Sequence, residues 1–407
     1  MVHLRRKILS LGNIVNQLQQ NVRWSSSLKT KDKNLVQPQR SFKYADLSVC
    51  FAGPDQLNPK PDVKELLFGK YFTDHMLKIH YYESMNGWQA PEIMPLGNIA
   101  LHPAAKVFHY ALELFEGMKA YRGVDGKIRL FRPELHMKRM NNSATRIGLP
   151  SFRDEELIKC ICRLISIDQE WVPHSTSSSL YIRPTFIGID PTLGVVPSDS
   201  ALLYVIMSPV GSYFKTTSTQ GISLLADPRY TRAWPGGCGN SKLGSNYGPT
   251  LQVQQEANEK GLHQVLWLYG ENHEVTEIGA MNIFMVYIND NGERELLTPP
   301  LNGLILPGIV RNSLLSIARE WNQFRVSERT VTMKEIIQLL SENRLLEIFA
   351  SGTASIITPV SHIQFLEQEL YIPTLNQSKP IYQMLRKYLL DIQYGVIPEH
   401  PWSVTIE

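Results

Sequence analysis

The segment Trp234–Gly261 reads WPGGCGNSKLGSNYGPTLQVQQEANEKG. It places one lysine, Lys242, between two glycine-rich turns, and Tyr247 follows a short way along the chain. Glycines let the backbone approach a bulky ligand closely and supply positive φ angles. A lone lysine in such a bend is a candidate Schiff-base nucleophile, because desolvation favours its neutral amine. The alternative is an ordinary surface lysine in a glycine-rich loop, and other parts of the chain must decide between the two.

Length and composition narrow the class of protein. The 407 residues are enough for two or three domains, and 43% hydrophobic with 19% charged residues is typical of a globular protein. The net charge of +3 does not indicate a nucleic-acid partner. No apolar run reaches the roughly 20 residues that span a bilayer, so no membrane segment is expected.

The cysteines indicate neither a disulfide scaffold nor a metal site. There are four, Cys50, Cys160, Cys162 and Cys238, and their scatter favours a reducing compartment. Cys160 and Cys162 lie two residues apart in a helical pattern and therefore point to different helix faces. We interpret them as small core residues and expect no bound metal.

Residues 1–40 have the composition of a mitochondrial transit peptide. The first acidic residue is Asp32, and six basic residues precede it: Arg5, Arg6, Lys7, Arg23, Lys29 and Lys31. A basic, hydroxylated and acid-free leader predicts import into the mitochondrial matrix, with cleavage near Ser25. A disordered basic tail on a cytosolic protein is the alternative.

The hydrophobic periodicity predicts mixed secondary structure. Apolar residues three to four apart predict helices within 134–150, 154–168, 250–261, 305–320, 329–343 and 380–395, the last closing the chain. Apolar and β-branched runs predict strands within 127–133, 179–189, 201–211, 264–270, 282–288 and 295–300, and a strand, tight turn and strand within 347–360.

Helices and strands do not alternate strictly, which favours an α+β fold over a doubly wound sheet. The polar segment near 211–222 predicts an interdomain linker. We therefore expect a leader at 1–40, a smaller α+β domain at 41–210 and a larger α+β domain at 223–407.

Five motifs occur in order: LFEGMKAYRG at 114–123, GGCGNSKLGSNYGPT at 236–250, TEIGAMNIF at 276–284, TPPLNGLILPGIVR at 298–311 and SGTAS at 351–355. Together they resemble the branched-chain amino-acid aminotransferases, which are pyridoxal-phosphate enzymes of the fold-type IV group. The resemblance runs from about Phe42 to the C-terminus. It implies two α+β domains with pyridoxal 5′-phosphate between them, and an obligate homodimer.

The resemblance also assigns roles to residues near the cofactor ring. Lys242 matches the Schiff-base lysine, which is also the acid–base group of the reaction. Glu277 matches the carboxylate that keeps the pyridine nitrogen protonated. A buried carboxylate needs a cationic partner of that kind. The alternative for Glu277 is a surface glutamate at a strand end. Tyr247 matches the tyrosine bonded to the phenolic oxygen of the cofactor.

The cofactor phosphate needs donors, and a helix that begins in LPGIVR offers backbone amides at its N-terminus. The resemblance implies a phosphate site made of Leu306, Gly308, Ile309, Val310, the Thr353 hydroxyl and Arg139. An arginine can bind phosphate in a bidentate manner. For Arg139 a solvated helix position is the alternative.

Substrate binding resembles an aromatic box around an apolar side chain. The matching aromatic residues are Phe68, Tyr110, Phe115, Tyr181 and Tyr213, and core packing is the alternative for each of them. Arg183 matches an arginine that orders these tyrosines. The backbone of Thr353 and Ala354 would bind the substrate carboxylate. Leu193 and Val195 match a loop that reaches the pocket of the neighbouring subunit.

The expected reaction is ping-pong transamination of leucine, isoleucine and valine with 2-oxoglutarate, so the partners are small molecules and a second copy of the chain. Two positions depart from the family pattern. Ser355 and Thr358 stand where vertebrate members have a redox-active Cys-x-x-Cys pair, and Ala280 stands where the family often has threonine. The rival interpretations are another fold-type IV enzyme, such as a D-amino-acid aminotransferase or an aminodeoxychorismate lyase, and a catalytically idle scaffold.

Overall fold

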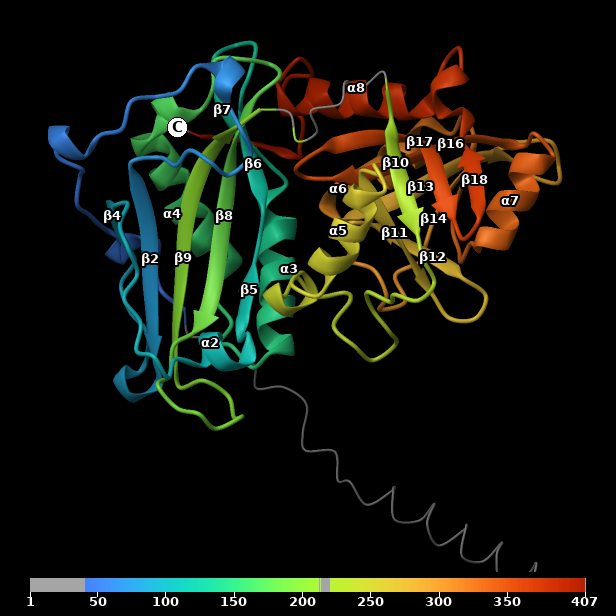
Figure 1. The fold of residues 1–407 in the computed structure, drawn as a ribbon. Coiled ribbons are helices and arrows are strands. Elements are labelled where there is room, and N and C mark those ends of the chain that lie inside the picture. Colours follow the sequence, from blue (N-terminus) through green and yellow to red (C-terminus); the bar gives the residue numbers. More distant parts are fainter. Residues whose placement is uncertain (1–40, 212, 214–219, 407) are drawn as a thin grey trace, which may run out of the picture. The chain divides into compact units, whose positions relative to one another are not determined.

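Two β-sheets organise the chain (Figure 1), and the computed structural model describes residues 41–211, 213 and 220–406. Within these residues ten strands form the first sheet. They are β1 (Ser48–Val49), β2 (His75–Tyr82), β3 (Gly87–Trp88), β4 (Glu92–Pro95), β5 (Glu113–Phe115), β6 (Met118–Arg122), β7 (Ile128–Phe131), β8 (Ser179–Gly188), β9 (Ser200–Val210) and β19 (Ser403–Ile406). The main path runs β1-β4-β2-β9-β8-β6-β7-β19, with β3 beside β2 and β5 beside β8.

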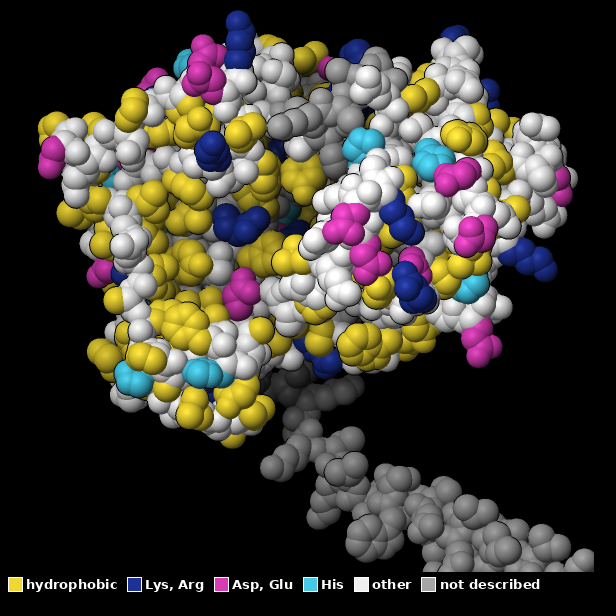
Figure 2. All heavy atoms as spheres, in the orientation of Figure 1, with side chains coloured by type: hydrophobic (Ala, Val, Ile, Leu, Met, Phe, Trp, Pro, Cys, Tyr) yellow, Lys and Arg dark blue, Asp and Glu magenta, His cyan; other side chains and the backbone are white. Residues whose placement is uncertain are grey.

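Helices cover one face of the first sheet. α3 (Pro133–Arg146) and α4 (Asp154–Ile167) lie behind it in Figure 1, and α2 (Lys106–Tyr110) lies at one end. Burial alternates along β9, since Val205 and Met207 are buried while Tyr204 and Ile206 are only half-buried. Val205 and Met207 therefore lie on the face that the helices cover. Figure 2 shows hydrophobic side chains gathered over the face that the helices leave open.

The second sheet has nine strands in the described part of the chain. They are β10 (Ile222–Ala226), β11 (Gln264–Tyr269), β12 (Glu274–Ile278), β13 (Met281–Ile288), β14 (Arg294–Thr298), β15 (Arg325–Glu328), β16 (Leu345–Gly352), β17 (Ile356–Phe365) and β18 (Gln368–Tyr371). Their order is β12-β11-β10-β17-β16-β13-β14-β15, with β18 beside β17. Because β12 also pairs with β13, six of these strands close into a ring around an apolar core.

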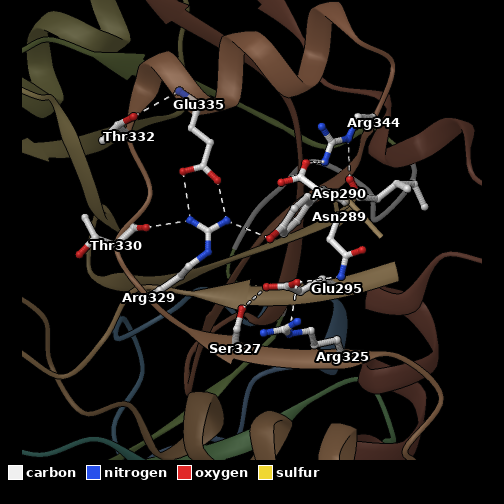
Figure 3. A network of polar contacts seen from close by, with 12 residues as sticks. Asn289, Asp290, Glu295, Arg325, Ser327, Arg329, Thr330, Thr332, Glu335 and Arg344 are labelled. Carbon is white, nitrogen blue, oxygen red and sulfur yellow. Dashed lines mark hydrogen bonds and ion pairs between the residues drawn. The ribbon is translucent and has the colours of Figure 1, made fainter. Parts of the chain in front are cut away.

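Among the described residues, four helices pack around this ring: α5 (Thr250–Glu259), α6 (Ile309–Trp321), α7 (Met333–Ser341) and α8 (Ile381–Gln393). Alternate residues of β13 serve opposite faces, since Met285 packs with the side of α7 while Phe284 packs with α6 and α8. A polar network holds α7 in place (Figure 3). Its first turn is capped by Thr332, which accepts from the Glu335 amide, and Arg329 pairs with the Glu335 carboxylate.

The structure confirms the predicted α+β class and each of the six predicted helices. It also confirms the predicted strands, including the strand, turn and strand of β16 and β17. The prediction that a helix closes the chain is wrong, because β19 follows α8 and pairs with β7 of the first sheet. A short, half-exposed strand such as Ser403–Ile406 has too few residues to show a clear alternation of its own.

Parts of the sequence prediction fall outside the described residues. The expected leader at 1–40 lies there entirely, and so does most of the expected linker at 211–222. The division into domains at that linker therefore stays a prediction. None of the described helices has both the length and the apolar character required to cross a bilayer.

Candidate active site

A cavity of about 230 Å³ is lined by side chains from both sheets. Fifteen of the predicted site residues line it: Phe68, Phe115, Arg139, Tyr181, Arg183, Tyr213, Lys242, Tyr247, Glu277, Leu306, Gly308, Ile309, Val310, Thr353 and Ala354. They come from positions far apart in the chain, so the fold is what assembles them. Among the described residues no group of three histidine, cysteine or acidic side chains is arranged to hold a metal ion.

Backbone contacts to the first sheet and α3 fix Lys242 at the cavity wall. Its amide donates to the Ser143 hydroxyl at 2.9 Å, and its carbonyl accepts from the Phe115 amide at 3.1 Å. The side chain runs into the cavity, where Nζ lies 3.0 Å from the Tyr247 hydroxyl and 4.7 Å from the centre of the Phe115 ring. The lysine predicted from the glycine-rich segment is therefore held in an aromatic wall of the cavity and not on the outer surface.

Glu277 is buried at the end of β12 with its oxygens in defined contacts. Oε1 accepts from the Asn282 side-chain amide and from the Leu306 backbone amide, both at 3.0 Å. Oε2 forms an ion pair with Arg232 at 2.7 Å. Burial raises the pKa of the Glu277 carboxyl, and the nearby Arg232 guanidinium opposes that rise.

A tight hairpin gives Glu277 this position. Glu277 pairs directly with Asn282 across β12 and β13, and a two-residue loop, Gly279–Ala280, connects the strands. Gly279 has a φ of 55°, and a positive φ at the first loop residue is the pattern of a type II′ turn. The hairpin therefore presents the carboxylate and the amide on one side, facing the cavity.

The N-terminus of α6 faces the same cavity. α6 begins at Ile309, and the first backbone bond of that turn runs from the Asn312 amide to the Gly308 carbonyl, so the amides before Asn312 have no acceptor within the helix. Such amides bind anions. Arg139 of α3 approaches from the other side and donates to the Pro307 carbonyl at 3.1 Å.

Aromatic side chains enclose the rest of the cavity. Phe68 contacts the rings of Tyr181 and Tyr213, with centroids 4.8 and 5.1 Å apart. Arg183 lies over the Phe115 ring at 4.6 Å and donates to the Tyr181 hydroxyl at 3.0 Å. The arginine thus contacts both Tyr181 and Phe115.

The turn between β16 and β17 completes the wall. Thr353 and Ala354 line the cavity, and the Ala354 carbonyl accepts from the Lys119 ammonium at 2.8 Å. Ile356, at the end of this turn, has a φ of 65°, which is uncommon for a β-branched residue and costs about 1–3 kcal/mol. Burial lowers the pKa of Lys119 to about 7.

The family described as amino-transferase class IV matches residues 113–363, which is more than half of the chain. The chain belongs to this family of aminotransferases.

Individual relatives of this aminotransferase have names that are more specific than the family description. A cytosolic branched-chain-amino-acid aminotransferase of Mus musculus is 53% identical over 366 residues, covering 90% of this chain and 94% of that protein. A mitochondrial branched-chain-amino-acid aminotransferase of Rattus norvegicus is 51% identical over 366 residues, covering 90% and 92%. Among solved structures, a branched-chain aminotransferase of the thermophilic archaeon Thermoproteus uzoniensis, with norvaline, has a TM-score of 0.65 at 25% identity and covers 77% and 97%.

Three of the predicted site residues lie away from the cavity of this aminotransferase. The Tyr110 hydroxyl donates to the Leu193 carbonyl, and both residues are exposed, as is Val195. Their exposed fractions are 39%, 64% and 82%. Tyr110 therefore does not join the aromatic box within its own chain, and the three residues share an outer surface.

Sequence reasoning missed several charged and polar groups that the aminotransferase uses to build the site. Arg232 pairs with Glu277, Glu116 pairs with Arg139, Asn282 bonds to Glu277, and Lys119 bonds to the Ala354 carbonyl. Glu116, Lys119 and Asn282 lie inside the quoted motifs, and that position was the signal that could have identified them as site residues. Arg232 lies outside them, and nothing in its local sequence shows that it reaches β12.

Proposed function

We propose that this aminotransferase transfers the amino group of leucine, isoleucine and valine to 2-oxoglutarate, with pyridoxal 5′-phosphate as its cofactor. The observation that carries the proposal is Lys242, whose Nζ lies 3.0 Å from the Tyr247 hydroxyl in a cavity that also contains Glu277. When bound, pyridoxal phosphate serves as the electron sink for cleavage of a bond at the substrate α-carbon. The names of the relatives and of the solved neighbour support the same activity.

The residues around the cavity fit this cofactor. The free amides at the start of α6, the Thr353 hydroxyl and Arg139 suit a phosphate group. Ionised Glu277 offers about four acceptor positions, and Asn282, Leu306 and Arg232 use three of them. One position therefore remains for a protonated ring nitrogen, which the carboxylate would hold in its cationic form.

Lys242 is the group that we propose moves the proton. Its Nζ takes a proton from the substrate α-carbon and would deliver it to the cofactor carbon on the other side of the substrate nitrogen. One positioned amine can act as base and then as acid in such a 1,3-shift. The Tyr247 hydroxyl and the Phe115 ring hold Nζ in place. In the second half of a ping-pong reaction the amino group passes to 2-oxoglutarate, and Lys242 moves the proton in the reverse sense.

Substrate selection follows from the remaining walls. Phe68, Phe115, Tyr181 and Tyr213 offer apolar ring faces to a branched aliphatic side chain. The backbone amides of Thr353 and Ala354 would bind the substrate carboxylate. Because Arg183 bonds to Tyr181 and lies over Phe115, it keeps both rings in position.

We also propose a homodimer. The surface that carries Tyr110, Leu193 and Val195 is exposed and apolar, and Phe108 beside it is 62% exposed. It continues into the open face of the first sheet that Figure 2 shows as hydrophobic. Large apolar patches of this kind are typical of protein interfaces. Leu193 and Val195 would then reach the cavity of the partner subunit.

The proposed location is the mitochondrial matrix. The support is the basic, acid-free composition of residues 1–31 and the existence of mitochondrial relatives of similar identity to the cytosolic ones. A fluorescent reporter fused behind residues 1–40 tests it. A diffuse cytosolic signal with an intact leader would contradict the matrix location.

The activity test uses the purified full chain with a panel of amino acids and 2-oxoglutarate. We expect visible absorption from bound cofactor, and glutamate formation that is fastest with L-leucine, L-isoleucine and L-valine. D-Alanine and aminodeoxychorismate should give no product, which separates the proposal from the other fold-type IV activities. A protein without cofactor absorption and without activity would indicate the idle scaffold.

A further inference from the structure

A buried acidic residue, Glu116, lies behind the proposed phosphate site. Its side chain is fully buried and contacts two side chains of α3. Oε1 accepts from Arg139 Nε at 2.7 Å, and Oε2 accepts from Arg139 Nη2 at 2.9 Å and from His136 Nδ1 at 2.9 Å. The Gly117 amide adds a further contact to Oε2 at 3.2 Å. The carboxylate is therefore held by several donors at once, as a buried charge requires.

The geometry divides the guanidinium of Arg139 into two edges. An arginine has five N–H donors. The edge formed by Nε and Nη2 is taken up by the bidentate contact with Glu116, and one N–H of Nη1 reaches the Pro307 carbonyl. Two N–H groups, one on Nη1 and one on Nη2, remain on the other edge. Pro307 lies two residues before Ile309, the first residue of α6, so this free edge lies beside the helix amides that the cavity exposes.

The charges explain why the arrangement is stable. Burial opposes ionisation of Glu116, but Arg139 and His136 lower the pKa of its carboxyl well below the usual range, so the carboxylate stays ionised. Burial lowers the pKa of His136, which therefore stays neutral. A neutral histidine facing a carboxylate must carry its proton on Nδ1. The cluster then has one negative and one positive charge, and Arg139 cannot turn away without leaving Glu116 unpaired.

We propose that Glu116 is a positioning residue for cofactor binding, which fixes the guanidinium of Arg139 so that its free edge faces the phosphate of pyridoxal phosphate. The inference rests on the proposed function, because it assumes the phosphate at the start of α6. Glu116 itself touches neither cofactor nor substrate in this role. Its effect should fall on the binding of the phosphate group.

The decisive measurement compares two ligands on the cofactor-depleted full chain. Pyridoxal phosphate and pyridoxal differ only in the phosphate group, so the ratio of their dissociation constants isolates the phosphate contribution. We expect Glu116→Gln to weaken pyridoxal phosphate about 10- to 100-fold, the value of one charge-assisted contact. Pyridoxal affinity should stay unchanged, so the ratio of the two dissociation constants should change by the same factor.

A buried glutamate elsewhere supplies the matched control. Glu347 accepts from the Ile381 and Tyr382 amides at the start of α8, away from the cavity. Glu347→Gln should lower stability without changing the ratio of the two ligands. If Glu116→Gln weakens both ligands equally, or neither, the positioning role is overturned.

Combining Glu116→Gln with Arg139→Gln tests whether Glu116 acts through Arg139. In the proposed arrangement Glu116→Gln adds nothing to the phosphate loss caused by Arg139→Gln, whereas additive losses overturn the proposal. Arg139→Lys covers the case in which Glu116→Gln does not fold. A lysine at position 139 can pair with Glu116 or with phosphate, but it has no second edge with which to bind both at once. We therefore expect weaker phosphate binding, and retention of wild-type phosphate affinity would also overturn the proposal. A wild-type chain that binds neither ligand would instead refute the proposed function.

Discussion

Replacing Gly308 by alanine probes the junction between the phosphate site and the Glu277 site. Gly308 precedes α6, and a Cβ atom added there would lie 2.0 Å from Asn282 Oδ1. A contact below 3.0 Å forces one side to move. Asn282 is buried, and its amide donates to Glu277 Oε1 at 3.0 Å and to the Leu306 carbonyl at 2.9 Å. The new methyl group therefore displaces either the Asn282 amide or the start of α6.

The contacts of Asn282 give the size of the effect. A hydrogen bond to a charged carboxylate contributes about 1.5–3 kcal/mol, and one to a neutral carbonyl contributes about 0.5–1.5 kcal/mol. Loss of both lowers the free energy of unfolding by about 2–4 kcal/mol. If α6 moves instead, its free amides shift relative to Arg139 and cofactor affinity falls.

Urea unfolding of the cofactor-depleted chain and titration with pyridoxal phosphate measure the two outcomes. Gly97→Ala is the matched control, because a Cβ there meets one atom at 3.9 Å and no positive φ is involved. We expect the control to change the free energy of unfolding by less than about 0.5 kcal/mol. The reasoning is refuted if Gly308→Ala equals the control in both stability and cofactor affinity.

Four further outcomes are expected. Lys242→Ala should abolish transamination while circular dichroism stays unchanged, and near wild-type turnover would contradict its assignment. Glu277→Gln should retain cofactor but slow the proton transfer in single-turnover experiments, because an amide cannot keep the ring nitrogen protonated; an unchanged rate would exclude this role. Burial lowers the pKa of Lys119 to about 7, so the unfolded chain binds more protons than the folded chain between about pH 7 and 10. The unfolding free energy should therefore rise with pH in that window. Lys119→Met should remove up to about 1.4 kcal/mol per pH unit of that slope. An identical slope in the variant would refute the shifted pKa of Lys119. Mild peroxide should leave activity intact, since burial raises the pKa of Cys160 to about 12 and of Cys162 to about 11; loss of activity reversed by a reductant would contradict this.

Local sequence carried most of the secondary structure. α8 and α4 were predictable because their apolar residues recur at helical spacing, and α5 because its end is followed by Gly261 at a φ of 74°. β19 was not, since a short half-exposed strand gains its structure from pairing with β7. Pairing partners depend on distant residues, and local periodicity does not encode them.

The motifs by themselves determined which residues are available for the chemistry. Lys242, Tyr247 and Glu277 were identified from their motifs, and the structure brings all three to one cavity. The same reasoning placed Tyr110 in the aromatic box, whereas it lies on the outer surface of its own chain.

Only the tertiary structure decided which charges face one another. Arg232 and Glu277 are 45 positions apart, and Glu116, between β5 and β6, is 23 positions from Arg139 on α3. Neither pair has a local signal, because the free energy of an ion pair depends on the burial that both partners share after folding. The sequence supplies the reacting groups, and the fold removes water from the carboxylates and arginines that hold those groups in position.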